Sequence, residues 1–323
     1  MSKSAQPPES DDSVPESDDS VRDSEVGAPQ PDYRLGEAGD LVIHAGPRQS
    51  PRILSVPTRH TAHVLDLADG DDLFPSVVGL LESLEVPGLM VEFVDGEFGR
   101  INYVYPAYGP DAEHPMSFTS EFHREGPATL NHASATVGSR DGAAFCHIHA
   151  SWITEEGVTR GGHLLPGTRV GPTGMRLRVF ALTDATLLSE TDPETGFSAF
   201  APVSAPTGPP TEEPADAVIS RVRPGELIDE AITSVCREAG FDSAEVRASL
   251  GSTTGAVFTD ASAPWPAVEF THLTGSITGA LGEDPLVRFE AEVIDVAGDV
   301  HAGVLATGAN PVAVTFELFV RLA

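Results

Sequence analysis

The 323-residue sequence contains a single lysine, Lys3, and its other basic residues are arginines. Its 19 basic residues stand against 49 acidic ones, which gives a formal net charge of −30. A chain this acidic repels the phosphates of nucleic acid unless its arginines gather on one face. The sequence contains no Lys/Arg cluster of that kind. We therefore expect that nucleic acid is not a partner.

Cysteine and long apolar runs are also scarce. The two cysteines, Cys146 and Cys236, cannot build a disulfide framework and fit a reducing compartment. No apolar run approaches the roughly 18 residues that span a bilayer, and the N-terminal MSKSAQPPESDD lacks the apolar segment of a secretory signal. The sequence thus predicts a soluble protein, located in the cytoplasm, that does not contact membranes.

Two segments rich in proline and acidic residues divide the chain. Residues 1–35 are poor in apolar residues and contain a duplication, ESDDSVP followed by ESDDSVR. Such a segment buries too little surface to offset the entropy lost on ordering, so it predicts a disordered acidic tail. The prolines of APVSAPTGPPTEEPAD, residues 201–216, predict a semi-rigid linker. The expected domains are therefore residues 36–200 and 217–323.

These two domains are predicted to be tandem repeats. A shift of 155 positions places HVLDLADGDD on VISRVRPGEL, and LFPSVVGLLESLEVPG on IDEAITSVCREAGFDS, so that apolar residues at helical spacing coincide. Further along, the shift becomes 141, which indicates that the second copy lacks a loop near YGPDAEHPM of the first. Each copy reads as strand, helix and several strands. The predicted fold class is α+β, with one main helix on a mostly antiparallel sheet in each copy.

The segment FCHIHASWITEEGVTRGGHLLPG, residues 145–167, holds three of the chain's 11 histidines. Alternation predicts a strand that presents His147 and His149 on one face and an apolar set on the opposite, core face. Glu156 is followed by a glycine, which is a turn signal. A hairpin centred on Glu156 places His163 directly across from His149, with β-carbons about 5 Å apart. The three imidazoles are therefore expected to converge.

Three neutral imidazoles suit zinc or another divalent transition metal with an open fourth position. That position can take water or the carboxylate of a ligand. The alternative is three unligated histidines, since a single strand histidine is usually only hydrogen-bonded. In the second copy the aligned residues are Arg288, Glu290 and Val304, whereas several glycines of the segment recur. Histidines needed only for folding would recur too, so we predict a metal site in the first copy alone.

Other residues carry weaker signals. Cys146 is expected to be a buried core thiol, because it points away from the histidine face. Glu121 and Arg160 are candidates to line a pocket near the metal. Four further histidines have no spacing that places them: His60, His63, His123 and His132. The sequence contains no phosphate-binding glycine loop, no serine nucleophile elbow and no Cys-x-x-Cys pair, and it identifies no catalytic residue.

At these residues the sequence resembles the plants-and-prokaryotes-conserved domain, called PPC or PCC. The first copy carries GDDL and HIHASWITEEGVTRGGHLLPGTRV; the second carries SLGSTTGAVF, LTGSITG and a degenerate AGDVHAGVLATGANPVAVTFEL. The resemblance covers most of residues 55–200 and 217–323, and it implies a compact α+β domain that forms a homotrimer. It also implies a metal held by His147, His149 and His163, as in some prokaryotic members. Plant members bind AT-rich DNA through an added AT-hook, and this sequence contains no Arg-Gly-Arg-Pro hook.

Three functions stay open. The first is a metal-binding, homo-oligomeric module with a binding or regulatory role and a small-molecule ligand at the metal. The second is a zinc-dependent hydrolase or lyase, which needs a general base that the sequence does not identify. The third, by family analogy, is a DNA-associated regulator, which needs a basic surface. A carboxylate in a pocket beside the metal would favour the enzyme. The sequence identifies neither ligand nor pathway, nor the arrangement of the copies in an oligomer.

Overall fold

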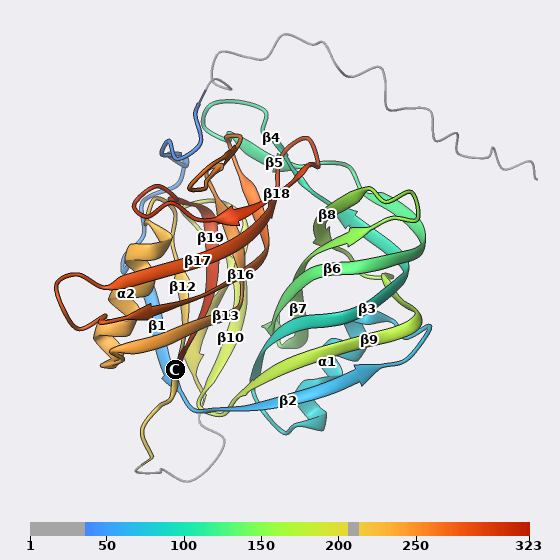
Figure 1. Cartoon of the computed structure of the whole chain (residues 1–323), viewed down its shortest axis with the longest axis horizontal. Coiled ribbons are helices and arrows are strands. Elements are labelled where there is room, and N and C mark those ends of the chain that lie inside the picture. The colour runs from blue at the N-terminus through green and yellow to red at the C-terminus, as the bar shows by residue number, and fades with distance from the viewer. Residues whose placement is uncertain (1–35, 206–212) are drawn as a thin grey trace, which may run out of the picture. The chain divides into compact units, whose positions relative to one another are not determined.

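The computed structural model describes residues 36–205 and 213–323, which contain two helices and two large sheets (Figure 1). The predicted acidic tail and the middle of the predicted linker lie outside the described residues. The helices are α1 (Leu73–Ser83) and α2 (Ile228–Ala239). Neither one has the length and hydrophobicity that a membrane crossing requires, and no other described segment is a helix of that kind.

Each large sheet belongs mainly to one copy, and nearly all of its strand pairs are antiparallel. The eight-stranded sheet has the spatial order β11 (Ser198–Ser204), β10 (Ala185–Thr191), β6 (Phe122–Arg140), β7 (Ala143–Ile153), β8 (Thr159–Leu164), β3 (Gly88–Val104), β9 (Arg169–Leu182), β2 (His60–Leu67). The seven-stranded sheet has the order β1 (Ile53–Thr58), β12 (Ala217–Val222), β19 (Val312–Leu322), β13 (Ser243–Thr253), β16 (Val268–Thr278), β17 (Leu286–Ile294), β18 (Val300–Val304). Strand β1 lies at the start of the first copy in sequence, yet it pairs with β12 of the second.

The two copies share one topology, as the tandem repeat predicts. In the first sheet β3 also pairs with β6, so the order β2-β9-β3-β6-β7-β8 matches β12-β19-β13-β16-β17-β18 strand for strand. Helices α1 and α2, and strands β3 and β13, begin 155 positions apart. The loop that the second copy lacks is the region of a short hairpin, β4 (Pro106–Tyr108) and β5 (Met116–Phe118). The second copy has a shorter hairpin there, β14 (Ala256–Val257) and β15 (Ser262–Ala263).

A recurring glycine explains part of the repeat signal. Gly96 and Gly251, 155 positions apart, have φ angles of +139° and +157°. A β-carbon on Gly96 would lie 2.5 Å from the carbonyl oxygen of Gly174, and one on Gly251 would lie 2.5 Å from that of Thr315. Only glycine allows strands to approach this closely at such a backbone angle.

The sheets pack face to face, with a helix on the outer face of each. Leu73 and Val77 of α1 join a core with the apolar face of β7, whereas α2 packs on the other sheet in a separate core. Between the sheets, Phe180 and Phe319 stand with ring centroids 5.1 Å apart in a third core shared by both copies. The predicted apolar face of β7 is confirmed. Its histidine face is covered as well, by the second copy.

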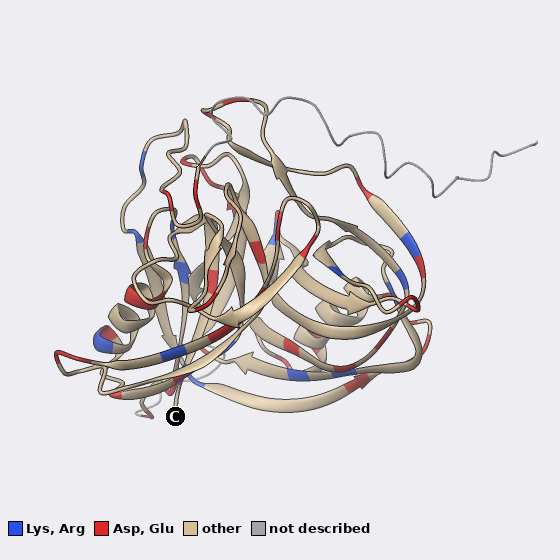
Figure 2. Cartoon of the chain, turned by 45° about the horizontal axis from the view of Figure 1, so that its top comes forward, with Lys and Arg blue, Asp and Glu red and all other residues tan. Residues whose placement is uncertain are grey.

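Basic and acidic residues are interspersed along the ribbon in the view of Figure 2. Exposed arginines lie beside acidic residues, as in Arg176–Asp66 at 2.8 Å and Arg288–Glu290 at 2.8 Å. The view in Figure 2 shows single blue segments separated by red and neutral ones rather than a basic stripe.

Candidate metal centre

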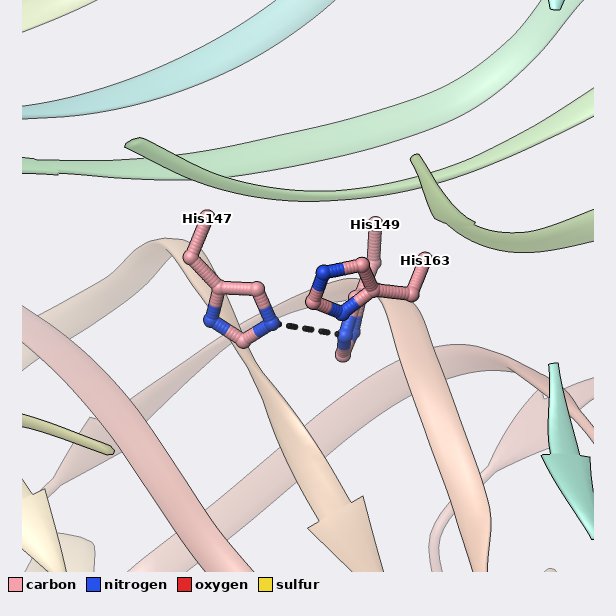
Figure 3. A group of neighbouring side chains, drawn as sticks. All are labelled: His147, His149 and His163. Atoms are coloured by element: carbon pink, nitrogen blue, oxygen red, sulfur yellow. Dashed lines mark hydrogen bonds between the residues drawn. The ribbon is translucent and has the colours of Figure 1, made fainter. Parts of the chain in front are cut away.

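Strands β7 and β8 bring three histidines together as the hairpin register requires (Figure 3). His149 and His163 are directly opposed in the register, and His147 lies two residues earlier on the same face. The ring centroid of His147 lies 4.5 Å from that of His149 and 4.8 Å from that of His163. One ligand nitrogen from each ring lies within 4.8 Å of the other two. The predicted convergence is thus confirmed.

The partners of His147 and His149 fix their tautomers. Nδ1 of His147 lies 3.1 Å from both carboxylate oxygens of Glu317, and Nδ1 of His149 lies 3.0 Å from the carbonyl oxygen of Phe270. A carboxylate and a carbonyl only accept, so both Nδ1 atoms must donate. The two Nε2 atoms then face each other at 2.9 Å. Two lone pairs at that distance repel, so either a proton or a cation belongs between them.

The surroundings shift the pKa values of His149 and His163 in opposite directions. Burial lowers the pKa of His149, but the charge of Glu269 and the hydrogen bonds to Glu269 and Phe270 outweigh burial and raise it. Burial, together with His147 and His149, lowers the pKa of His163 well below its ordinary value. His163 is neutral at physiological pH, which is the form that ligates metals.

Two buried glutamates of the second copy lie next to the histidine triad. Glu269 on β16 has Oε1 3.3 Å from Nε2 of His149, and its Oε2 is buried with no hydrogen-bond partner among the described residues. The side chain of Glu317 on β19 is 1% exposed. Burial raises the pKa of Glu317, but the neighbouring His147 outweighs burial and holds it below its ordinary value. Carboxylates behind ligating histidines orient the rings and raise their basicity.

A cavity of about 270 Å³ opens beside the triad, between the two copies. Arg140 and Glu269 line it, together with Met116 and Phe118 of the hairpin that is longer in the first copy. Glu121 and Arg160, the two candidates from the sequence, are not among its lining residues. Arg160 instead donates a hydrogen bond to the carbonyl oxygen of Thr159.

The site fits a divalent transition ion. A tetrahedral zinc ion with bonds of about 2.0–2.1 Å holds its nitrogen ligands about 3.3 Å apart, which is close to the 2.9 Å between the facing Nε2 atoms. Buried Nδ1 of His163 has no hydrogen-bond partner in the described part of the chain. A neutral imidazole triad with an adjacent carboxylate is a donor set that zinc prefers.

Comparison with known families decides the lineage of the chain. The model of the Plants and Prokaryotes Conserved (PCC) domain matches residues 55–180 and again residues 210–322. The chain belongs to the PCC domain family. It carries the domain twice, as the sequence resemblance indicates. A search of curated proteins gives no match to this PCC chain.

Three solved structures similar to this PCC protein each align with less than half of it. A plant- and prokaryote-conserved protein from Pyrococcus horikoshii has 15% identity and a TM-score of 0.36, over 44% of this chain and 93% of its own. A metal-containing protein from Archaeoglobus fulgidus has 20% identity and a TM-score of 0.36, over 45% and 96%. A protein from Ralstonia eutropha named as a candidate DNA-binding protein has 15% identity and a TM-score of 0.36, over 44% and 95%.

The second PCC copy has no equivalent triad. Glu290 pairs with Val304 in its β17–β18 register, at the place that His149 and His163 take in the first copy. Arg288 and Glu290 form an exposed ion pair there. The degenerate copy thus keeps the strands and supplies Glu269 and Glu317 across the interface.

The remaining sequence candidates lie outside the triad. Cys146 is buried in the first core, and burial raises its pKa. The four unplaced histidines contact other groups: His60 contacts Asp216 at 2.9 Å, His63 contacts Thr61 at 2.9 Å, His123 contacts Asn102 at 3.0 Å, and His132 stacks on His272 at 4.4 Å between centroids. The one signal for the missed glutamates is an acidic residue inside an apolar strand, as in VTFELF and AVEF.

Proposed function

We propose that this PCC protein binds one divalent transition metal ion, zinc by its donor set, at His147, His149 and His163. The observation that carries this proposal is the pair of facing Nε2 atoms at 2.9 Å, whose rings are both fixed by hydrogen bonds at Nδ1. Such fixed tautomers point both lone pairs at one place. The cavity beside them gives the ion an open side for a small-molecule ligand.

The role that fits this arrangement is a binding or regulatory module. The second copy supports the first by holding His147 through Glu317 and His149 through Phe270. A homotrimer, as the family resemblance implies, and a cytoplasmic location complete the proposal. A role with DNA is left out, because exposed arginines such as Arg176 and Arg288 are paired with acidic residues and the chain carries a net charge of −30.

Metal analysis of the full chain, purified without a histidine tag, tests the proposal. We expect about one zinc per chain, removed by prolonged dialysis against a chelator and restored by adding zinc. Native mass on the same sample should be about three times the 33.9 kDa of one chain. A chain that neither holds nor takes up zinc, cobalt or nickel would reduce the three histidines to structural residues.

A zinc-dependent hydrolase or lyase is a second candidate, which the buried carboxylate of Glu269 favours. Its Oε2 has no partner within the described ranges, and the side chain lines the cavity beside His149. When bound, zinc would supply a Lewis acid and acidify a coordinated water; Glu269 would then hold or accept the proton.

Hydrolysis of p-nitrophenyl acetate by the zinc-loaded protein tests this candidate. If Glu269 is the general base, Glu269→Gln should lower the turnover number about 100-fold, with metal content measured alongside. A turnover number that is the same in Glu269→Gln and in the original protein would rule out that role.

A further inference from the structure

Arg140, at the end of β6, is placed unlike the arginines that neutralise surface acids. Its Nε and Nη2 donate to the hydroxyl of Ser189 at 3.1 and 3.0 Å, and its guanidinium lies 3.8 Å above the ring of Phe145. It makes no ion pair with any residue of the two described ranges. Yet it lines the cavity that also holds the histidine triad. Its positive charge is therefore available to something in the cavity.

The charges around the cavity favour an anion once a metal is present. Its ionisable lining residues are the three histidines, Arg140 and Glu269. When the imidazoles are neutral, the positive charge of Arg140 and the negative charge of Glu269 cancel. A divalent ion adds two positive charges, and Glu317 behind His147 removes one. Counting only the groups that line the cavity or hold its histidines, the loaded site would thus carry a net charge of about +1, which suits one carboxylate better than a doubly charged phosphate ester.

The rest of the cavity wall is apolar. Phe118 lies edge-on to His163 with centroids 5.6 Å apart, and Phe197 lies edge-on to Phe118 at 6.1 Å. Met116 and Val314 extend this wall. A volume of about 270 Å³ lies just below the roughly 300–1,000 Å³ of typical ligand sites. The cavity therefore suits a small molecule with an apolar body.

Arg140 and the aromatic wall are specific to the first copy. The residue aligned with Arg140 in the second copy is Leu281, which is 54% exposed. Phe118 belongs to the longer hairpin, β4–β5. Both features thus occur only in the copy that has the histidine triad, although the two copies share the fold.

We infer that the cavity binds a small organic monocarboxylate with an apolar or aromatic body, whose carboxylate lies between the metal and Arg140. This inference rests on the proposed metal site. The apolar body lies against Phe118 and Phe197, and Arg140 supplies the charge-assisted hydrogen bond that a carboxylate accepts.

Calorimetric titration of the zinc-loaded full chain tests the inference. The probes are acetate, benzoate and 3-phenylpropanoate, with benzamide as the neutral counterpart of benzoate and phenyl phosphate as the dianion. We expect benzoate to bind at least about tenfold more tightly than benzamide, and more tightly than phenyl phosphate. Arg140→Gln should weaken benzoate binding by about tenfold or more while zinc content stays unchanged. Phe118→Ala should weaken the binding of benzoate but leave the binding of acetate unchanged.

Several outcomes would overturn the inference. They are no binding of any of the three carboxylates at about 10 mM, equal binding of benzoate and benzamide, tighter binding of phenyl phosphate, or benzoate binding that Arg140→Gln does not change. Zinc analysis of the same samples separates the two proposals. A chain that holds zinc but fails these tests loses only the carboxylate inference, whereas a chain that holds no zinc loses both.

Discussion

His163→Ala is expected to lower the zinc content of the purified protein from about one per chain to a small fraction of that. His163 is the one proposed ligand that β8 supplies, and its loss would leave only two histidines from a single strand for the proposed ion. We expect the affinity for zinc to fall by more than about 100-fold, beyond the 10- to 100-fold typical of changes behind the ligands. Zinc competition with a chromophoric chelator measures the affinity. Circular dichroism should show an unchanged fold, because the histidines are absent from the second copy, which has the same topology.

Two matched variants sharpen this test. Glu317→Gln keeps the shape of the side chain that holds Nδ1 of His147 but removes its charge, so zinc affinity should fall by about 10- to 100-fold with full occupancy restored at excess zinc. His63→Ala removes a half-buried histidine whose Nε2 lies 2.9 Å from the hydroxyl of Thr61, and it should leave zinc binding unchanged. Equal zinc content in His163→Ala and His63→Ala would refute the three-histidine site.

The histidine triad could be predicted because its geometry is local. His149 and His163 belong to one hairpin, whose register follows from the turn after Glu156 and from strand alternation. The tandem repeat was equally accessible, since Gly96 and Gly251 meet the same steric demand in both copies. The triad depends on contacts between residues close in sequence, and the repeat signal depends on a steric constraint that each copy meets within its own sheet.

The rest of the site could not be predicted because it forms between the copies. Glu317 is 170 positions from His147, and nothing in spacing alone indicates that β19 crosses behind β7. Arg140 was missed because its register with Ser189 depends on how β10 joins the edge of β6. The sequence correctly indicated that the histidine face of β7 differs from its core face. It did not indicate that a second sheet covers that face.

Asp192→Ala is expected to have the largest effect on stability. Asp192, 2% exposed, lies after β10 of the first copy and accepts hydrogen bonds from Arg221, at 2.6 Å, and Arg223 of the second copy. Removing the carboxylate leaves two buried guanidinium groups without their shared acceptor. The loss of one partner of a buried ion pair typically costs about 3–5 kcal/mol of unfolding free energy. Urea denaturation measures this loss. Asp66→Ala, which breaks the exposed pair with Arg176, should cost less than about 1 kcal/mol.

The pH dependence of the Asp192 effect distinguishes an ion pair from simple packing. Burial raises the pKa of Asp192, but Arg221 and Arg223 outweigh burial and hold it below its ordinary value. A depressed folded-state pKa contributes stability that is complete above the unfolded value of about 3.9 and is lost as pH falls through the folded value. The stability difference between the original protein and Asp192→Ala should therefore be constant near neutrality and shrink below about pH 4. A difference that stays constant down to the acid limit of folding would indicate packing instead. Arg221 lies directly opposite Glu317 in the β12–β19 register, so the same arginine joins this network to the carboxylate that holds His147.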